Sequence, residues 1–358
     1  NKNYNRIPKD YNFKTAPYPH QLEGIEYGLN DNNWILGDDQ GLGKTKQIID
    51  LACILKKERN IKHCLIVCGV NNLKYNWEHE VGIHSNEKAY ILGTRILSNG
   101  KKKIGSIEDR ITDLKNLPEA LFIITNIETL RNTKFIDQLK KTNFDMMVID
   151  EVHRVKNPTS EQGKNILKTI NIPYKVALSG TMIMNSPLDA YTPLKWLGIE
   201  KSNFSTFKNY YCVYGGFGNH QVMSYKNLAV LKDMISQHML RRLKNDVLNL
   251  PPKIRQIEYV EMKPAQKRIY NEIKAGLKAN IDLIASSLNP LEELLRLRQA
   301  TAYTGILSSN IKESAKFDRL EELVEDLISE NAKYVNKHIA ESVKHLKAQR
   351  FNSKSNLF

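Results

Sequence analysis

The chain has 358 residues, enough for about two domains. Its hydrophobic content of 41% and charged content of 26% are those of an ordinary globular protein, and no run of about 18 apolar residues is present, which excludes a membrane-spanning helix. Lys plus Arg exceed Asp plus Glu by 53 minus 39, and this net charge of +14 suggests an anionic partner such as nucleic acid.

The first residues lack the apolar core of a signal peptide, so we expect the chain to act in the cytoplasm. Its richness in Lys, Asn and Ile is typical of an AT-rich bacterial or phage genome. The four cysteines, Cys53, Cys64, Cys68 and Cys212, show no paired CxxC spacing. Cys64 and Cys68 fall in one predicted strand, about 13 Å apart. That is too far for a disulfide, so we expect free buried thiols and no metal centre.

A helix is predicted over residues 18–30, just ahead of a short apolar strand at 34–36. Gln21 lies in the first turn of this helix. Its amide offers both a donor and an acceptor, so it could recognise the edge of an adenine if a nucleotide site follows. Taken alone, Gln21 would be assigned to the surface.

Residues 38–45, DDQGLGKT, follow that strand and open a second predicted helix. Glycines let successive backbone N–H groups surround phosphate oxygens, and the helix N-terminus adds partial positive charge. The segment therefore predicts a phosphate-binding loop, in which Lys44 neutralises the terminal phosphates and the Thr45 hydroxyl binds Mg²⁺. The other nucleotide contacts are expected from residues in or beside the same loop: Asp39, Gln40, Gly41, Leu42, Gly43 and Gln47.

One position departs from the general phosphate-loop pattern. Asp38 stands five residues before Gly43, where a glycine is usual, and Gly37 lies one place earlier. An ordinary glycine turn followed by Lys-Thr would read the same way, so the loop alone leaves that alternative open.

Further apolar runs at 64–68 and 121–124, and a weaker one at 90–92, predict strands buried on both faces. Between the first two, residues 71–80 form a polar, helix-like stretch. Residues 93–120 are polar and poorly patterned, and their three consecutive lysines, 101–103, are expected in a solvated loop.

The apolar run at 146–149 leads directly into Asp150 and Glu151. Such a junction places two carboxylates at the carboxyl edge of a parallel sheet, where open α/β sheets bind ligands. Asp150 would hold Mg²⁺ through water, and Glu151 would orient and deprotonate a water that attacks the γ-phosphate. The alternative is an ordinary acidic strand end, which the phosphate loop about a hundred residues upstream argues against.

The next predicted strand, 175–178, ends in Ser-Gly-Thr. Small hydroxyl groups at a strand tip can bond both the Asp-Glu segment and a nucleic-acid phosphate. We therefore expect His153, Ser179 and Thr181 to couple the nucleotide site to a nucleic-acid site. Alone, this tripeptide would be a generic turn.

With these motifs in this order, the sequence resembles the Snf-type, chromatin-remodeller-like DNA translocases of helicase superfamily two. The family's phosphate loop also lacks the first glycine. The chain departs from the family at Gly69 and Met182, where proline is common, and at Val152, where alanine is usual. The segment LRRLKNDV followed by LPPK is a signature of this family in particular. The resemblance covers roughly residues 17–330 and rests on seven segments: 18–24, 36–45, 65–77, 123–130, 150–157, 178–181 and 240–253.

The resemblance implies an α/β fold, a RecA-like ATP-binding lobe with a parallel sheet flanked by helices, over residues 1–262. A helical insertion is expected at 195–250, and residues 254–262 are expected to return as a strand. Residues 263–308 would form a helical protrusion. Residues 309–358 would begin a second RecA-like lobe or form a helical tail, so that this second lobe is largely absent.

Only 28 residues follow Glu330 (358 minus 330), whereas a second lobe needs about 150. We find no glutamine-glycine-arginine-arginine motif of the kind that supplies arginine fingers, which contribute about 10³–10⁵ in rate. As given, the chain is expected to bind ATP and hydrolyse it slowly, with the second lobe truncated or supplied by another chain.

The resemblance further implies an ATP- and Mg²⁺-dependent enzyme that moves along double-stranded DNA, usually without separating the strands. Two other functions stay open. One is a non-catalytic module that binds ATP and DNA. The other is an unrelated phosphate-loop ATPase or kinase, whose turnover DNA would leave unchanged. Under the leading hypothesis, DNA phosphates would contact basic, amide and hydroxyl groups, namely Lys74, Thr125, Asn126, Lys156 and Thr181.

Overall fold

The chain divides into two compact units, residues 1–251 and 252–358. Two predicted segments lie outside the described residues, the LPPK segment at 250–253 and the tail from 330 onward. Among the residues described, no helix is long and apolar enough to cross a membrane. The computed structural model describes residues 6–70, 72–98, 100, 102–169, 171–183, 185–216, 218, 221–248, 255–281, 290–308 and 311–329.

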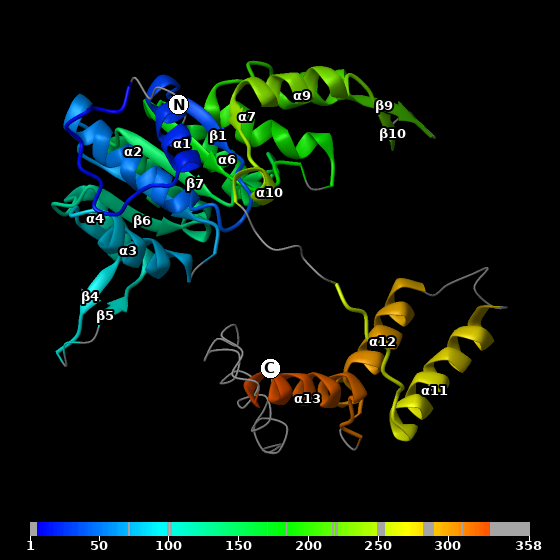
Figure 1. Ribbon diagram of the computed structural model, residues 1–358. Helices are drawn as coiled ribbons and strands as arrows, with labels where there is room; N and C mark the ends of the chain where they lie inside the picture. The colour runs from blue at the N-terminus through cyan, green and yellow to red at the C-terminus, as the bar shows by residue number, and fades with distance from the viewer. Residues whose placement is uncertain are drawn as a thin grey trace. The chain divides into compact units, whose positions relative to one another are not determined.

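The first unit is built on a seven-stranded sheet in which all neighbouring strands are parallel, which confirms the predicted α/β fold (Figure 1). All strands therefore end at the same edge of the sheet. Their order across the sheet is β11 (Met239–Leu240), β1 (Asn33–Leu36), β8 (Tyr174–Leu178), β7 (Met146–Asp150), β2 (Cys64–Cys68), β6 (Phe122–Asn126) and β3 (Ala89–Ile91).

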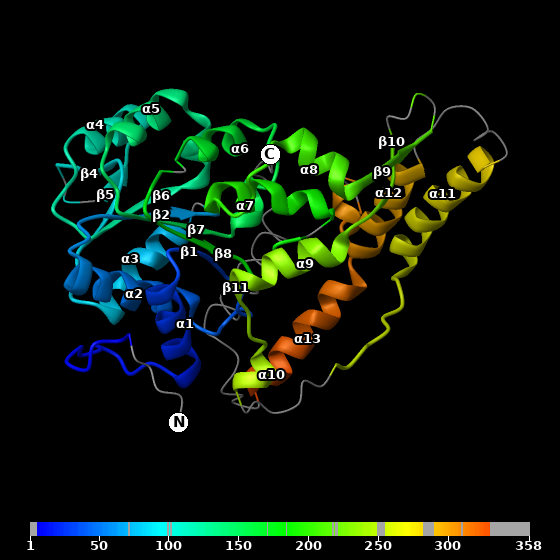
Figure 2. The ribbon, with the colours of Figure 1, turned by 90° about the horizontal axis from the view of Figure 1, so that it is seen from above.

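Helices cover both faces of this sheet (Figure 2). Alternate strand residues pack into two separate cores: Leu65 and Val67 face one layer, and Ile66 faces the other. This double burial explains why the strands read as continuous apolar runs. One face carries α1 (Pro19–Asn30), α2 (Lys44–Arg59) and α3 (Leu73–His84), and the other carries α4 (Ile107–Lys115), α5 (Thr133–Lys141), α6 (Glu161–Ile166) and α7 (Tyr191–Leu197).

The insertion predicted to be helical, residues 195–250, is only partly so. It contains α8 (Phe204–Tyr211), α9 (Leu228–Gln237) and α10 (Lys244–Val247), but also an antiparallel ribbon of β9 (Cys212–Gly215) and β10 (Gln221–Tyr225). It also returns to the main sheet as β11, which pairs with Ile35 and Leu36 of β1. Two residues are too short to show a strand period, so the sequence pattern missed this edge strand.

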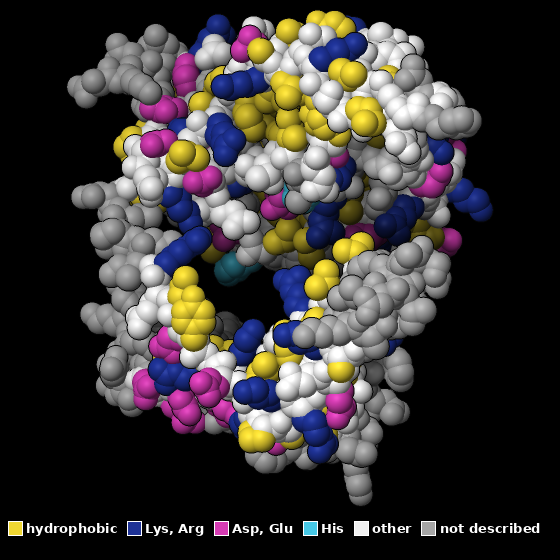
Figure 3. Space-filling model, turned by 90° about the vertical axis from the view of Figure 1, so that its right-hand side faces the viewer, with side chains coloured by type: hydrophobic (Ala, Val, Ile, Leu, Met, Phe, Trp, Pro, Cys, Tyr) yellow, Lys and Arg dark blue, Asp and Glu magenta, His cyan; other side chains and the backbone are white. Residues whose placement is uncertain are grey.

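The β9–β10 ribbon contributes no residue to the two cores, whereas α9 packs Leu231 and Ile235 into one of them. Every residue of β10 is exposed, and Met223 of β10 and Leu228 of α9 are 64% and 48% exposed. Figure 3 shows hydrophobic side chains gathered on the face of the first unit that carries these elements. The ribbon therefore adds little to the packing that positions the sheet.

The lysines at 101–103 were predicted to lie in a loop, and that prediction is wrong for two of them. Lys102 and Lys103 belong to β5 (Lys102–Ile104), which pairs with β4 (Thr94–Ile96) in a second two-stranded ribbon, while Lys101 lies outside the described residues. Both side chains are exposed, as expected.

Short 3-10 turns complete the described part of the unit at η1 (Ile127–Arg131), η2 (Val152–Val155), η3 (Leu167–Thr169) and η4 (Pro187–Ala190).

The elements of the second unit are helices, as far as its residues are described. It contains α11 (Pro264–Ile281), α12 (Pro290–Ala302), η6 (Thr304–Ile306) and α13 (Ala315–Ser329), as the pattern over 264–305 predicted. Gln266 ties these helices together, since its amide donates to the Ala300 carbonyl at 2.8 Å and accepts from the Ala315 N–H at 3.3 Å.

The strand predicted over residues 254–262 is not formed in the described part, 255–262. Ile257 and Tyr259, whose alternation suggested a strand, are 75% and 93% exposed, so neither buries a face against a neighbour. By its contacts this segment belongs to the second unit, and the division falls at 251/252 rather than at 262.

Candidate nucleotide-binding site

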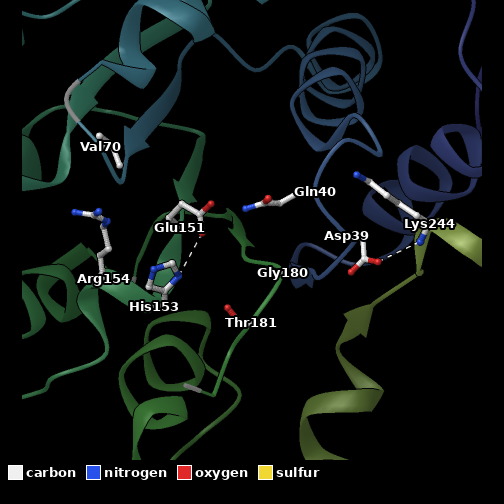
Figure 4. Close-up of a pocket in the computed structure, with 9 residues that line it drawn as sticks. All are labelled: Asp39, Gln40, Val70, Glu151, His153, Arg154, Gly180, Thr181 and Lys244. Carbon is white, nitrogen blue, oxygen red and sulfur yellow. Dashed lines mark hydrogen bonds and ion pairs between the residues drawn. The ribbon is translucent and has the colours of Figure 1, made fainter. Parts of the chain in front are cut away.

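The carboxyl ends of β1, β8 and β7 lie side by side, and each is followed by predicted site residues. The phosphate loop follows β1, residues 179–181 follow β8, and Glu151 follows β7. Because neighbouring parallel strands end at one edge, the fold brings three distant segments together. They border a cavity of about 530 Å³, shown in Figure 4 and lined by Asp39, Gln40, Val70, Glu151, His153, Arg154, Gly180, Thr181 and Lys244.

The loop between β1 and α2 has the backbone of a phosphate cradle. Gly41 and Gly43 have φ angles of 82° and 72°, in the left-handed region that favours glycine. Lys44 begins the 16-residue helix α2, whose N-terminus is a preferred place for an anion. The Lys44 ammonium donates to the loop's own carbonyl oxygens, those of Asp38 at 2.8 Å and Asp39 at 3.3 Å. A phosphate would replace these two acceptors.

Asp38, the residue at the unusual first position of the loop, is fully buried and paired with Arg242. The Arg242 Nε donates to Asp38 Oδ1 at 3.0 Å and its Nη2 to Oδ2 at 2.5 Å, which makes a two-point ion pair. Gln47 bridges the pair: its Nε2 donates to Asp38 Oδ2, and its Oε1 accepts from Arg242 Nη2, both at 3.0 Å. Arg242, which follows β11, therefore anchors the first residue of the phosphate loop.

Of the predicted nucleotide contacts, Asp39 and Gln40 line the cavity, whereas Gln21, residues 41–45 and Gln47 do not. Gln47 is 1% exposed and lies within the network beneath the loop. Gln21 is buried against Gly43, with its Nε2 donating to the Leu42 carbonyl at 3.4 Å and its Oε1 accepting from the Tyr18 N–H at 3.0 Å. An amide has two hydrogens and two lone pairs, so Gln21 keeps capacity for an adenine edge, and that role stays a prediction.

The acidic pair at the end of β7 is held in an unusual geometry. Glu151 has a φ of 54°, a left-handed conformation that is costly for a residue with a side chain and that clusters at functional sites. Gly69, at the end of the neighbouring β2, permits this arrangement: a Cβ there would lie 2.6 Å from Glu151 Cβ and 2.9 Å from the Asp150 carbonyl oxygen. The close approach explains why a glycine follows β2.

Asp150 is partly buried, and the burial of its carboxyl raises the pKa above the usual value. The Trp77 indole N–H donates to Asp150 Oδ2 at 3.0 Å, which opposes the rise by stabilising the charged form. The carboxylate is thus positioned by α3 in a site that would favour a nearby cation.

The three predicted coupling residues lie in one chain of contacts. His153 Nδ1 is 3.3 Å from Glu151 Oε2 and 3.4 Å from Ser179 Oγ. The Ser179 hydroxyl in turn donates to the Thr181 carbonyl at 2.7 Å and accepts from the Thr181 N–H at 3.1 Å. A continuous path therefore runs from the Glu151 carboxylate to the exposed Thr181.

Comparison with known proteins shows to which family the chain belongs. The family model described as "SNF2-related domain" matches residues 20–306, more than half of the chain. The chain belongs to the SNF2-related domain family. The resemblance to Snf-type proteins predicted from the seven motifs is thereby confirmed.

A solved structure, the SWI2/SNF2 ATPase core of Sulfolobus solfataricus in complex with dsDNA, resembles this SNF2-related domain. The two are 26% identical with a TM-score of 0.53, and the match covers 90% of this chain and 67% of that one. It confirms the predicted type of lobe, since the parallel sheet with flanking helices belongs to the same ATPase-core fold.

Curated relatives are longer proteins. The Chromodomain-helicase-DNA-binding protein 3 homolog of Caenorhabditis elegans is 29% identical over 285 residues, covering 75% of this chain and 15% of that protein. The DNA annealing helicase and endonuclease ZRANB3 of Mus musculus is 30% identical over 272 residues (72% and 24%). An uncharacterized ATP-dependent helicase of Mycoplasma pneumoniae is 28% identical over 325 residues (86% and 29%). The SNF2-related domain thus spans less than a third of each relative.

Three of the predicted DNA contacts of this SNF2-related domain are buried. Lys74, Thr125 and Asn126 are 4%, 2% and 7% exposed, and Asn126 Oδ1 accepts from Arg110 Nη1 at 3.0 Å. Their burial does not favour direct contact with DNA. Lys156 is partly exposed, and its ammonium pairs with Asp189 at 3.0 Å. Thr181 is exposed, so Lys156 and Thr181 remain the accessible candidates.

Sequence reasoning missed several residues of the SNF2-related domain's site. Lys244 lines the cavity, and its backbone N–H donates to Asp39 Oδ2 at 3.1 Å. Arg154 and Val70 also line it. Trp77 donates a hydrogen bond to Asp150, and Arg242 pairs with Asp38. Arg242 and Lys244 belong to the LRRLKNDV signature, which was the available signal, but a signature alone does not say what its side chains contact.

The donor groups fit a magnesium ion that arrives with a phosphate ligand. Among the described residues, no group of three or more His, Cys, Asp or Glu side chains could hold a metal ion. Mg²⁺ does not need one, because it typically takes one or two protein oxygens and completes its shell with water and phosphate. The Thr45 hydroxyl in the first turn of α2 and the Asp150 carboxylate at the end of β7 could supply such oxygens.

Replacing Asp150 with asparagine is expected to stabilise the ligand-free domain. Because the pKa of Asp150 is raised in the folded state, its ionised carboxylate lowers the stability of the fold at pH values above that pKa. This loss of stability disappears as the pH falls to 3.8, the usual pKa of the carboxyl. Asp150→Asn should therefore raise the free energy of unfolding by about 0.5–2 kcal/mol at neutral pH, with a smaller gain in acid. Urea titrations at two pH values, with the exposed Asp137→Asn as control, measure this. A less stable Asp150→Asn would contradict it.

Proposed function

We propose that this SNF2-related domain is the ATP-binding motor domain of a translocase that acts on double-stranded DNA. It would couple ATP hydrolysis to movement along the duplex. The observation that carries the proposal is that Asp39 and Gln40 of the phosphate loop, Glu151 after β7, and Gly180 and Thr181 after β8 line one cavity. The dsDNA complex of the related Sulfolobus core supports DNA as the second ligand.

In the proposed reaction, the loop holds the phosphates of ATP. Its glycines and the N-terminus of α2 present backbone N–H groups, and the Lys44 ammonium moves from the loop carbonyls to the phosphate oxygens. Lys244 lies above the loop, with Nζ 3.2 Å from the place where a Gly41 Cβ would be, and adds a second positive charge. Thr45 and Asp150 would hold Mg²⁺, which neutralises charge that develops on the phosphates.

Glu151 is the proposed general base. Its carboxylate borders the cavity, where it can orient a water toward the terminal phosphate and accept its proton. When its Nδ1 carries the proton, His153 can donate to Glu151 Oε2 and fix the direction of the carboxylate. The strained backbone of Glu151 and the glycine opposite it keep this carboxylate at the sheet edge.

DNA would act on the reaction through the path from Thr181 to Glu151. A phosphate held at the exposed Thr181 would alter the Ser179 hydrogen bonds, and through His153 the position of the Glu151 carboxylate. Such phosphate binding is independent of sequence and weakens as salt is added. The net charge of +14 favours this kind of partner.

Nucleotide binding tests the first half of the proposal. Lys44→Ala should weaken ATP binding by about 10- to 100-fold, because a charge-assisted hydrogen bond to phosphate is worth about 1.5–3 kcal/mol. The measurement is a titration of a fluorescent ATP analogue. Lys56→Ala, at the other end of α2 and paired with Glu87, is the matched control. Unchanged affinity in Lys44→Ala would place the nucleotide elsewhere.

A further inference from the structure

A second hollow of about 860 Å³ lies at the opposite edge of the first unit's sheet, where the strands begin. Its lining comes from the amino ends of β2, β7 and β8 and from the carboxyl-terminal ends of α4 and α5. Strands of five residues separate the two edges by about 16 Å. A ligand in this hollow therefore need not compete with a nucleotide.

Part of the lining of the hollow is apolar, among polar and charged side chains. Leu114, Leu139 and Phe144 line it while they are 2%, 3% and 5% exposed, so their small exposed areas belong to side chains that are part of the core. Leu117 and Ile172 are partly buried and continue this lining. Such a surface gains free energy from an apolar group that covers it.

Five lysines surround this apolar lining, from separate segments: Lys62 before β2, Lys115 at the end of α4, Lys140 and Lys141 at the end of α5, and Lys168 in η3. Among the described residues, the first four of these ammonium groups make no ion pair or hydrogen bond, and Lys168 donates to the Asn165 side chain at 2.8 Å. The hollow is therefore strongly positive.

The one acidic side chain in the lining, Asp145, does not neutralise these lysines. Its Oδ2 accepts from the backbone N–H groups of Lys62 at 2.7 Å and His63 at 3.2 Å. It therefore holds the start of β2 in place. The positive charge of the hollow stays available to a ligand.

Stabilisation of helix ends does not account for this arrangement. Lysines in the last turn of a helix interact favourably with the helix dipole. Here, however, the Thr142 hydroxyl lies 3.0 Å from the carbonyl oxygens of both Leu114 and Gln138, near the ends of α4 and α5. Lys62 is not in a helix at all. The feature common to all five lysines is that they line the hollow.

We propose that this hollow binds an acidic peptide segment of a partner protein, with a large apolar side chain seated between the lysines. Carboxylates of the peptide would pair with the ammonium groups, and the apolar side chain would cover Leu139 and Phe144. A DNA backbone would satisfy the charges but has no apolar group to place on that lining. The inference is independent of the proposed motor function.

The test uses a labelled peptide of about 12 residues in which Glu alternates with Leu and Phe, measured by fluorescence polarisation at about 0.15 M salt, where distant charges are screened. Reversing two charges in the hollow, Lys140→Glu/Lys141→Glu, should weaken binding at least about tenfold. The matched control, Lys102→Glu/Lys103→Glu on the exposed ribbon, changes the net charge equally and should bind like the wild type. Nucleotide affinity, unchanged in both variants, shows that the unit is folded.

A second peptide, with every Leu and Phe replaced by Ser, keeps the charge and should bind at least about fivefold more weakly. Equal binding of the two peptides, or equal losses in the two lysine variants, would overturn the proposal. So would a duplex DNA that displaces the peptide and depends on the same two lysines, because the hollow would then be a nucleic-acid site.

Discussion

Replacing Glu151 with glutamine is expected to lower the rate of ATP hydrolysis by about 10²–10⁴-fold while ATP binding persists. The amide has nearly the same size and can still hydrogen-bond to water, but it cannot accept a proton. Glu151 is held at the cavity by its left-handed backbone and by His153, so the substitution removes the base without removing its position. Single-turnover hydrolysis, with ATP affinity from a separate titration, separates the chemical step from binding.

The control for Glu151→Gln is Glu128→Gln. Glu128 follows β6 at the same edge of the sheet and does not line the cavity. It should leave the single-turnover rate unchanged. If Glu151→Gln hydrolysed ATP as fast as the wild type, Glu151 would not be the base, although the phosphate loop would still stand as the binding site.

Replacing Arg242 with alanine is expected to destabilise the first unit by about 3–5 kcal/mol, the usual cost of leaving one member of a buried ion pair alone. Asp38 is fully buried, and without Arg242 its carboxylate keeps the hydrogen bond from the Gln47 amide. The phosphate loop begins at Asp38, so ATP affinity should fall along with stability. Urea unfolding gives the loss of free energy, and a nucleotide titration of the folded protein gives the loss of affinity.

The neighbouring Arg241 is exposed and serves as the matched control. Arg241→Ala should change stability by no more than about 0.5 kcal/mol. The double variant Asp38→Ala/Arg242→Ala removes both charges and should recover part of the lost stability, which assigns the effect to the pair. Equal losses in Arg241→Ala and Arg242→Ala would contradict the anchoring role of Arg242.

The sheet was predictable because its strands are buried on both faces and therefore read as apolar runs, as at 64–68 and 146–149. Elements that bury little were not: Met239 and Leu240 form only two pairs with β1, and β10 is exposed along its length. A strand that buries few side chains shows no hydrophobic pattern in the sequence, so it cannot be predicted from one.

The site was predictable where function follows chain order. Lys44, Asp150 and Glu151 stand next to strand ends, and parallel strands bring those ends together. Long-range pairing was not predictable, since nothing in the spacing links Arg242 to Asp38, 204 positions away. The sequence also does not show whether a polar residue at the end of a strand is buried. Asn126 was predicted to contact DNA, but it is buried and accepts a hydrogen bond from Arg110.

The most direct test of the motor proposal is the rate of ATP hydrolysis, with and without duplex DNA, by a version of the protein that also carries a second RecA-like lobe, at low and then at increasing salt. We predict that duplex DNA raises the rate, that this increase disappears as salt releases the DNA, and that Glu151→Gln abolishes it. A rate that duplex DNA leaves unchanged at low salt, while ATP is bound at the loop, would contradict a DNA-coupled motor.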